Sequence, residues 1–220
     1  MVVEKCLLMH PPSKRFSWVM FSCSIFMILY GYDVLAAPKL EEKLLALSSV
    51  QTLFRHETNR GRAHHGELWI ERPNKFRLQT NTPWKQTLVS NGKRFWNFDS
   101  DLEQVTVDWL EQDIGKYPIL LFTGPVEDLR NFYNISNYSD KGFSEYHLTP
   151  KTQGQYVKSM RFIFRGLLPV RIVIIDVMDE HSEFSFNSTQ VNSDLPDELF
   201  EFLPPPDIEV LDRTKTTWSP

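Results

Sequence analysis

Apolar and polar residues alternate along most of the chain from residue 66 onward, in short runs separated by turn-forming residues. A two-residue period places every second side chain on one face of a strand, so each run predicts a strand with one buried face. The pair Asn91 and Gly92 suits a tight antiparallel hairpin. Strands are predicted over residues 66–72, 75–80, 85–90, 94–99, 103–108, 132–138, 143–149, 158–165, 170–178 and 182–191. The pattern predicts one antiparallel sheet, curled or closed.

Other segments follow a helical pattern. Apolar residues recur at helical spacing over residues 38–54, which predicts an amphipathic N-terminal helix. Residues 117–122 predict a short apolar helix opened by Pro118, and residues 197–202 predict a last helical turn. The polar residues 59–66 are expected to form a hinge. The chain is therefore predicted to be mainly β within the α+β class, with helices laid against the sheet.

The N-terminal residues 1–36 have the pattern of a secretory signal peptide. Lys14 and Arg15 precede the apolar run 16–30, and small residues surround Ala36. The run is shorter than the roughly 20 apolar residues that a membrane-spanning helix needs. We expect cleavage after Ala36 and export of the remaining chain, with an uncleaved N-terminal anchor as the alternative.

Residues 37–220 are predicted to form a single domain, because a chain of this length normally has one core. Both cysteines, Cys6 and Cys23, precede this domain, which excludes disulfides and thiol chemistry within it. The formal net charge is −4. Without a basic excess to bind phosphates, no nucleic-acid partner is expected.

Motifs for catalysis or metal binding are not found. The chain has no GxSxG, no phosphate-binding glycine loop, no HExxH and no EF-hand pattern. The adjacent His64 and His65 would face opposite sides of a strand, so with His56 they are expected in a solvated hinge rather than at a metal. Asp176, Asp179 and Glu180 could suggest a carboxylate pair, but they lie where a strand runs into a turn and are expected to be solvated. We expect neither an enzyme nor a bound metal or cofactor.

Aromatic residues are numerous, making up 13% of the chain. They could fill the core of a sheet protein, or a curved sheet and its helices could enclose a cavity for an aliphatic ligand. The composition does not decide between these alternatives. Arg72 shares a strand face with Leu68 and Ile70, so a cation is predicted where apolar residues are expected.

Five short motifs follow one another along the chain. They are Leu-Trp-Ile-Glu-Arg-Pro-Asn-Lys-Phe at 68–76, Val-Ser-Asn-Gly-Lys-Arg-Phe-Trp-Asn-Phe-Asp at 89–99, Leu-Glu-Gln-Val-Thr at 102–106, Leu-Thr-Pro-Lys at 148–151 and Phe-Glu-Phe-Leu-Pro-Pro at 200–205. Taken in this order, they resemble the periplasmic outer-membrane lipoprotein carrier proteins of the LolA family. The resemblance runs from about residue 40 to about residue 210. The chain departs from it at His56, where the family usually has glutamine.

The resemblance implies an incomplete antiparallel β-barrel whose open side is covered by helices and whose hydrophobic cavity receives the acyl chains of lipoproteins. It implies that Arg72 hydrogen-bonds the backbone of this helical lid and holds the empty carrier closed, with Tyr117, Pro118 and Leu121 in the lid. The alternative for Arg72 is a stem that covers apolar surface and a head in water. The acyl-chain cavity is expected to be lined by Leu68, Ile70, Phe76, Leu78, Trp96, Phe98, Phe122, Met160, Phe162 and Phe164.

The resemblance also implies partners. They are acylated lipoproteins, an inner-membrane ABC transporter of the LolCDE type that loads the carrier, and an outer-membrane receptor of the LolB type that unloads it. The carrier is expected to be a periplasmic monomer. Two rival classes remain, an exported lipid-metabolising enzyme and a periplasmic lipid or lipoprotein sensor or adaptor with the same half-barrel.

Overall fold

The computed structural model describes residues 38–61, 63–81, 83–110, 120–127, 129–152 and 156–215. The predicted signal peptide lies outside these ranges and stays a prediction. Within the described residues, no helix is both long and apolar enough to cross a membrane.

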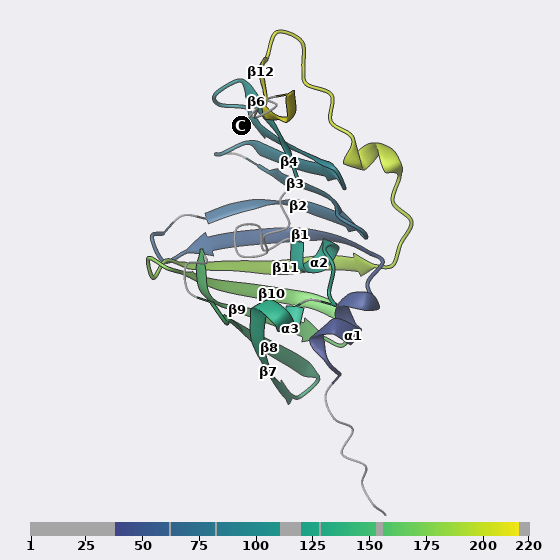
Figure 1. Cartoon of the computed structure of the whole chain (residues 1–220), viewed down its shortest axis with the longest axis vertical. Coiled ribbons are helices and arrows are strands. Elements are labelled where there is room, and N and C mark those ends of the chain that lie inside the picture. Colours follow the sequence, from purple (N-terminus) through teal and green to yellow (C-terminus); the bar gives the residue numbers. More distant parts are fainter. Residues whose placement is uncertain are drawn as a thin grey trace, which may run out of the picture. The chain divides into compact units, whose positions relative to one another are not determined.

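Strands make up most of the described chain, and the helices are short (Figure 1). The helices are α1 (Leu40–Leu45), α2 (Leu120–Thr123) and α3 (Leu129–Phe132), with 3-10 turns η1 (Asp197–Phe200) and η2 (Arg213–Lys215). The strands are β1 (Ser49–Thr58), β2 (Ala63–Glu71), β3 (Lys75–Thr80), β4 (Gln86–Asn91), β5 (Arg94–Asp99), β6 (Gln104–Trp109), β7 (Tyr133–Asp140), β8 (Phe143–Pro150), β9 (Val157–Arg165), β10 (Leu168–Asp176), β11 (His181–Val191) and β12 (Glu209–Asp212).

All strands join one 12-stranded sheet in the order β12-β6-β5-β4-β3-β2-β1-β11-β10-β9-β8-β7. Neighbouring strands are antiparallel except for β12, which pairs with β6 in parallel. In the part of the chain that the structure describes, β12 and β7 are edges that do not pair with each other, so the sheet is open. This confirms the predicted fold class, an incomplete antiparallel barrel with helices over one face.

The main core lies between that face and the helices. Leu40 and Leu44 of α1, Phe122 of α2 and Leu129 of α3 pack in one cluster with inward residues of the sheet. On β9 the predicted alternation is confirmed: Met160, Phe162 and Phe164 are fully buried, whereas Arg161 and Arg165 are exposed on the other face. We call this covered side of the sheet the inner face.

A second, smaller cluster lies on the outer face. Val89, Trp96, Val105 and Val107 pack there against Phe98, Phe202 and Ile208. The last two belong to the C-terminal segment, which leads from β11 past the ends of the neighbouring strands to β12, as Figure 1 shows in yellow. This segment gives the sheet apolar contacts on both faces near β5.

The prediction of one helix over residues 38–54 is correct only for its first turns. Helix α1 ends at Leu45, and strand β1 begins at Ser49. Leu40, Leu44 and Leu47 do follow a helical period, but Val50, Thr52 and Phe54 are buried at a period of two. β1 lies between β2 and β11 at the centre of the sheet, so pairing on both sides decides its conformation.

The hinge predicted over residues 59–66 is also wrong for its second half, because β2 begins at Ala63. Gly66 lies opposite Phe54 on β1 and Thr80 on β3. A Cβ built at Gly66 would lie 2.0 Å from the main-chain oxygen of Gln79. The glycine therefore permits a close approach between β2 and β3 beside the ring of Phe54.

Candidate functional site

Arg72 follows the last residue of β2 and reaches the C-terminal end of helix α2. Its Nη1 donates a hydrogen bond to the main-chain oxygen of Phe122 at 2.9 Å, and Nη2 donates to that of Gly124 at 2.7 Å. The main-chain N–H of Asn74 donates to the oxygen between them, on Thr123, at 3.0 Å. Three successive carbonyls at a helix end thus accept hydrogen bonds from the turn after β2. We call this set of bonds the lid contact.

The electrostatics of the lid contact suit a cation. The last carbonyls of a helix have no partner within the helix and carry partial negative charge. Burial lowers the pKa of the Arg72 guanidinium, and the nearby Glu127 opposes that shift. An arginine keeps its charge under such conditions, so the carbonyls compensate a partly desolvated cation.

Phe122 places a large apolar side chain on the inner face of the sheet. It is 2% exposed and contacts Phe162 in a T-shaped arrangement with ring centroids 6.0 Å apart. Its ring also meets Phe164 at 6.4 Å and Phe186 at 6.5 Å. Helix α2 therefore fills this end of the inner face with its own side chain while Arg72 bonds its backbone.

Helix α1 covers the neighbouring part of the inner face. The hydroxyl of Tyr146 donates to the main-chain oxygen of Pro38 at 2.6 Å, and Lys43 Nζ donates to that of Gly166. Lys43 also lies over the ring of Phe164, 5.5 Å from its centroid, and burial lowers the pKa of its ammonium group. Together α1 and α2 cover the aromatic residues of β8 and β9.

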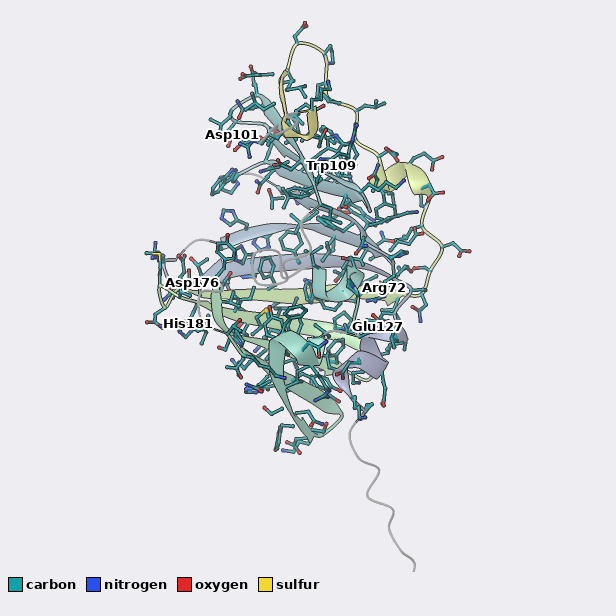
Figure 2. All side chains as sticks on the ribbon, in the orientation of Figure 1. Arg72, Asp101, Trp109, Glu127, Asp176 and His181 are labelled. Atoms are coloured by element: carbon teal, nitrogen blue, oxygen red, sulfur yellow. The ribbon has the colours of Figure 1, made fainter. Side chains whose placement is uncertain are left out.

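A cavity of about 420 Å³ opens on the same face, where β1 and β10 end and β2 and β11 begin. This volume is within the usual range for small-ligand sites. Figure 2 shows Asp176, which lines the cavity, at the end of the strands opposite to Arg72. The cavity is lined by Phe54, His56, Thr58, His64, Leu78, Thr80, Trp84, Gln86, Leu88, Ile174, Asp176, Glu180, Ser182 and Phe184.

The structure gathers most of the predicted cavity residues on the inner face, but only Leu78 lines this cavity. The others are packed in the main core beside the cavity, around Phe122 and the helices. They are Leu68, Ile70, Phe76, Phe122, Met160, Phe162 and Phe164. A role in binding acyl chains stays a prediction for all of them, and it requires that α2 move away from the sheet.

The placement of Trp96 and Phe98 in the cavity is wrong, because both belong to the cluster on the outer face. Phe95 is the residue of β5 that packs in the main core, where its ring lies 6.0 Å from that of Phe76. Since β5 has aromatic residues on both faces, its alternation alone does not identify the inner one.

Of the predicted lid residues, Tyr117 and Pro118 lie outside the described residues, and their role stays a prediction. Leu121 belongs to α2, but its side chain is also outside the described part. The backbone of α2 is described, and it is the part that Arg72 contacts.

Sequence reasoning missed the histidines of the cavity. His56 and His64 are partners on β1 and β2, with rings 6.0 Å apart, and neither lies in a hinge. Burial, and to a smaller extent the neighbouring His64, lowers the pKa of His56 to about 4. The alternation of Val50, Thr52, Phe54 and His56 was the available signal. Among the described residues, no group of three or more His, Cys, Asp or Glu could hold a metal ion.

Comparisons of the sequence with known proteins point to one family. The family model described as "Outer membrane lipoprotein carrier protein LolA" matches residues 43–203. An outer-membrane lipoprotein carrier protein from Alcanivorax borkumensis is 33% identical over 149 residues, covering 67% of this chain and 71% of that protein. One from Legionella pneumophila is 26% identical over 197 residues, covering 85% and 96%. A solved LolA superfamily structure from Nitrosomonas europaea has a TM-score of 0.41 at 12% identity, covering 74% of this chain and 96% of that one.

Proposed function

This chain belongs to the LolA family of outer membrane lipoprotein carrier proteins, and from this premise we propose how it carries a lipoprotein. The acyl chains of the lipoprotein bind on the inner face of the sheet, in the cavity and in the space that Phe122 fills when the carrier is empty. Helix α2 moves off the sheet on loading, and the lid contact made by Arg72 favours the empty, closed state.

The observation that supports this proposal is the position of Phe122. Its ring is buried among Phe162, Phe164 and Phe186, on the same inner face as a cavity that is already open. The ring of Phe122 is apolar, and Arg72 bonds the main-chain oxygen of this residue. A movement of α2 away from the sheet would therefore extend the cavity along apolar side chains. An acyl chain would then replace one apolar group by another on the same surface.

The energetics favour transfer by direct contact. Burying one methylene group is worth about 0.8 kcal/mol, so a long acyl chain would leave a carrier for water very slowly. We propose that a LolCDE-type inner-membrane transporter loads this carrier in the periplasm and that a LolB-type receptor unloads it. The carrier itself performs no catalysis in this scheme.

The test is native mass spectrometry of the protein purified from the periplasm of a lipoprotein-producing cell, for the wild type and for Arg72→Leu. We expect an acylated protein to copurify with both, and in larger amount with Arg72→Leu because the closed state is weakened. The matched control is Arg77→Leu. Arg77 is also partly buried and donates to a main-chain oxygen, that of Leu199, but it does so on the outer face.

Two results would count against the proposal. Equal loading of wild type, Arg72→Leu and Arg77→Leu would show that the lid contact does not gate binding. No acylated protein on any of the three would remove the support for carriage by this face and would favour the sensor or adaptor.

A further inference from the structure

The cavity at the end of the strands opposite to Arg72 has polar side chains as well as apolar ones. His56 pairs with His64 across β1 and β2, and on its other side it stacks on Phe184 of β11, with ring centroids 4.1 Å apart and planes at 7°. Trp84 approaches His64 edge-on, with centroids 5.6 Å apart. The rings form a row across three strands along one side of the cavity.

Two buried side-chain atoms of residues that line this cavity lack hydrogen-bond partners within the described part of the chain. His64 Nδ1 and Thr58 Oγ1 are both buried, and neither has a partner among the described residues. Both residues line the cavity. Buried polar atoms are nearly always hydrogen-bonded, because leaving one unpaired is costly. His56, by contrast, shares a hydrogen bond between its Nε2 and Ser182 Oγ. Both unpaired atoms thus belong to cavity-lining residues of adjacent strands, Thr58 on β1 and His64 on β2.

The charges around the cavity select against an anion. Among the described residues that line it, none is a lysine or an arginine, while Asp176 and Glu180 are acidic. Asp176 Oδ1 accepts the main-chain N–H groups of Met178 and Glu180, each at 2.8 Å, and Glu180 pairs with Arg60 at 3.5 Å. Burial keeps His56 neutral at neutral pH, since its pKa is lowered to about 4. An uncharged hydrogen-bonding group fits these surroundings better than a carboxylate or a phosphate.

We propose that this cavity binds the uncharged carbonyl group by which an acyl chain is attached to its lipoprotein, an amide or an ester, through His64 and Thr58. A neutral histidine can carry its proton on Nδ1, and a threonine hydroxyl can donate, so both can donate to a carbonyl oxygen. The chain then extends along the inner face toward Phe122. This inference rests on the proposed function and adds an orientation to it, with the carbonyl at the end of the strands opposite to Arg72.

The experiment measures dissociation constants of soluble probes for the purified protein, by displacement of an apolar fluorescent dye. The probes are N-methyldecanamide, methyl decanoate, decanoate and dodecane, delivered from cyclodextrin. The variants are Thr58→Val, His64→Leu and the double variant, which remove the two polar atoms and keep apolar bulk. His147→Leu is the matched control, because His147 is an exposed histidine on β8 that pairs with Glu145.

We expect the wild type to bind the amide or the ester more tightly than decanoate. The double variant should lose about tenfold in affinity for the carbonyl probe, the size expected for one or two buried hydrogen bonds. Binding of dodecane should be unchanged in every variant. The larger loss, for amide or for ester, identifies which kind of acyl linkage the cavity prefers.

The inference is overturned if the double variant binds all probes with the affinity of the wild type. It is also overturned if the variant loses as much affinity for dodecane as for the amide and the ester. If the wild type binds the probes but prefers decanoate, the argument from charge is wrong. If the wild type binds none of the probes, the proposed function fails together with the inference. Thr58→Val removes a single hydroxyl, so it provides the test if His64→Leu does not fold.

Discussion

Arg72 donates a hydrogen bond from Nη1 to the main-chain oxygen of Phe122 at 2.9 Å. The residue whose ring fills the inner face of the sheet is thus bonded through its own backbone to the turn after β2. The position of the Phe122 side chain therefore depends on a single charged residue, Arg72, at the end of β2. Helix α2 has only four residues, too few to hold its place by its own hydrogen bonds.

We expect Arg72→Leu to increase local opening of α2. Hydrogen bonds to a charged group are worth about 1.5–3 kcal/mol each, so the loss of both should raise the open population by roughly a hundredfold or more. Hydrogen–deuterium exchange at residues 122–124 should therefore be faster. Arg72→Lys should be intermediate, because an ammonium group cannot present the same fork of donors to two carbonyls. Unchanged exchange in both variants would mean that side-chain packing alone holds α2 in place.

We expect Phe122→Ala to have opposite effects on stability and on ligand capacity. Replacing a buried phenylalanine by alanine costs about 3–5 kcal/mol of unfolding free energy, less if α2 settles onto the sheet. The space released lies beside Phe162 and Phe164, so binding of a long acyl probe should be tighter than in the wild type. Denaturant unfolding and probe titration of the same preparation measure both effects. A stability loss with weaker acyl binding would show that Phe122 contacts the ligand rather than occupying its place.

Most strands and the fold class were predictable because alternation survives where one face is buried. On β9, Met160, Phe162 and Phe164 could be assigned to the inside because Arg161 and Arg165 interrupt them. β5 shows the limit of this reasoning, since Phe95 faces the main core while Trp96 faces the C-terminal segment. Which face is inner there depends on where distant residues such as Phe202 lie, and no local pattern contains that information.

The conformation of residues 49–58 was not predictable from local periodicity for a related reason. Leu47, Val50 and Phe54 also fit a helical spacing, and the strand forms because β2 and β11 are both available to pair with it. The same pairing brings His56 and His64 together, and the row with Phe184 needs three strands from distant parts of the chain. The local sequence therefore predicts solvated histidines, although β1 and β2 place His56 and His64 at the cavity.

We expect the stability of the protein to decrease as the pH falls from about 6.5 to about 4, in part because of His56. The pKa of His56 is lowered from 6.5 to about 4 in the folded state, so in this window the unfolded chain binds a proton that the folded chain does not. The full effect, reached near pH 4, is roughly 3 kcal/mol.

The check is chemical unfolding of the wild type and of His56→Gln across this pH range. The glutamine side chain of His56→Gln cannot titrate, so the stability of this variant should change less between pH 6.5 and pH 4. The other ionisable residues that line the cavity, His64, Asp176 and Glu180, are the same in both proteins. If the stability of the two proteins changed in parallel with pH, the lowered pKa of His56 would not contribute to the pH dependence. A thermal shift at pH 8 serves as the reference, because His56 is neutral in both states there.

We expect Gly66→Ala to destabilise the sheet through a steric clash. The added Cβ would lie 2.0 Å from the main-chain oxygen of Gln79 and 2.7 Å from the ring of Phe54. Because the first contact is with backbone, β2 and β3 must separate, and a cost of about 1–3 kcal/mol or more is expected. Gly142→Ala is the matched control. A Cβ there meets nothing within 4 Å, so its cost comes from its φ of +83° alone.

Adding Phe54→Leu to Gly66→Ala separates the two contacts. Leucine would relieve the contact with the ring but not the contact with the Gln79 oxygen, so the double variant should recover only part of the lost stability. Denaturant unfolding of both single variants and the double variant gives the coupling energy. Full recovery would show that β2 and β3 can move apart at little cost, and additive losses would show that Phe54 already turns away from residue 66. Since Phe54 also lines the cavity, partial recovery would tie the shape of the ligand site to the close approach of β2 and β3.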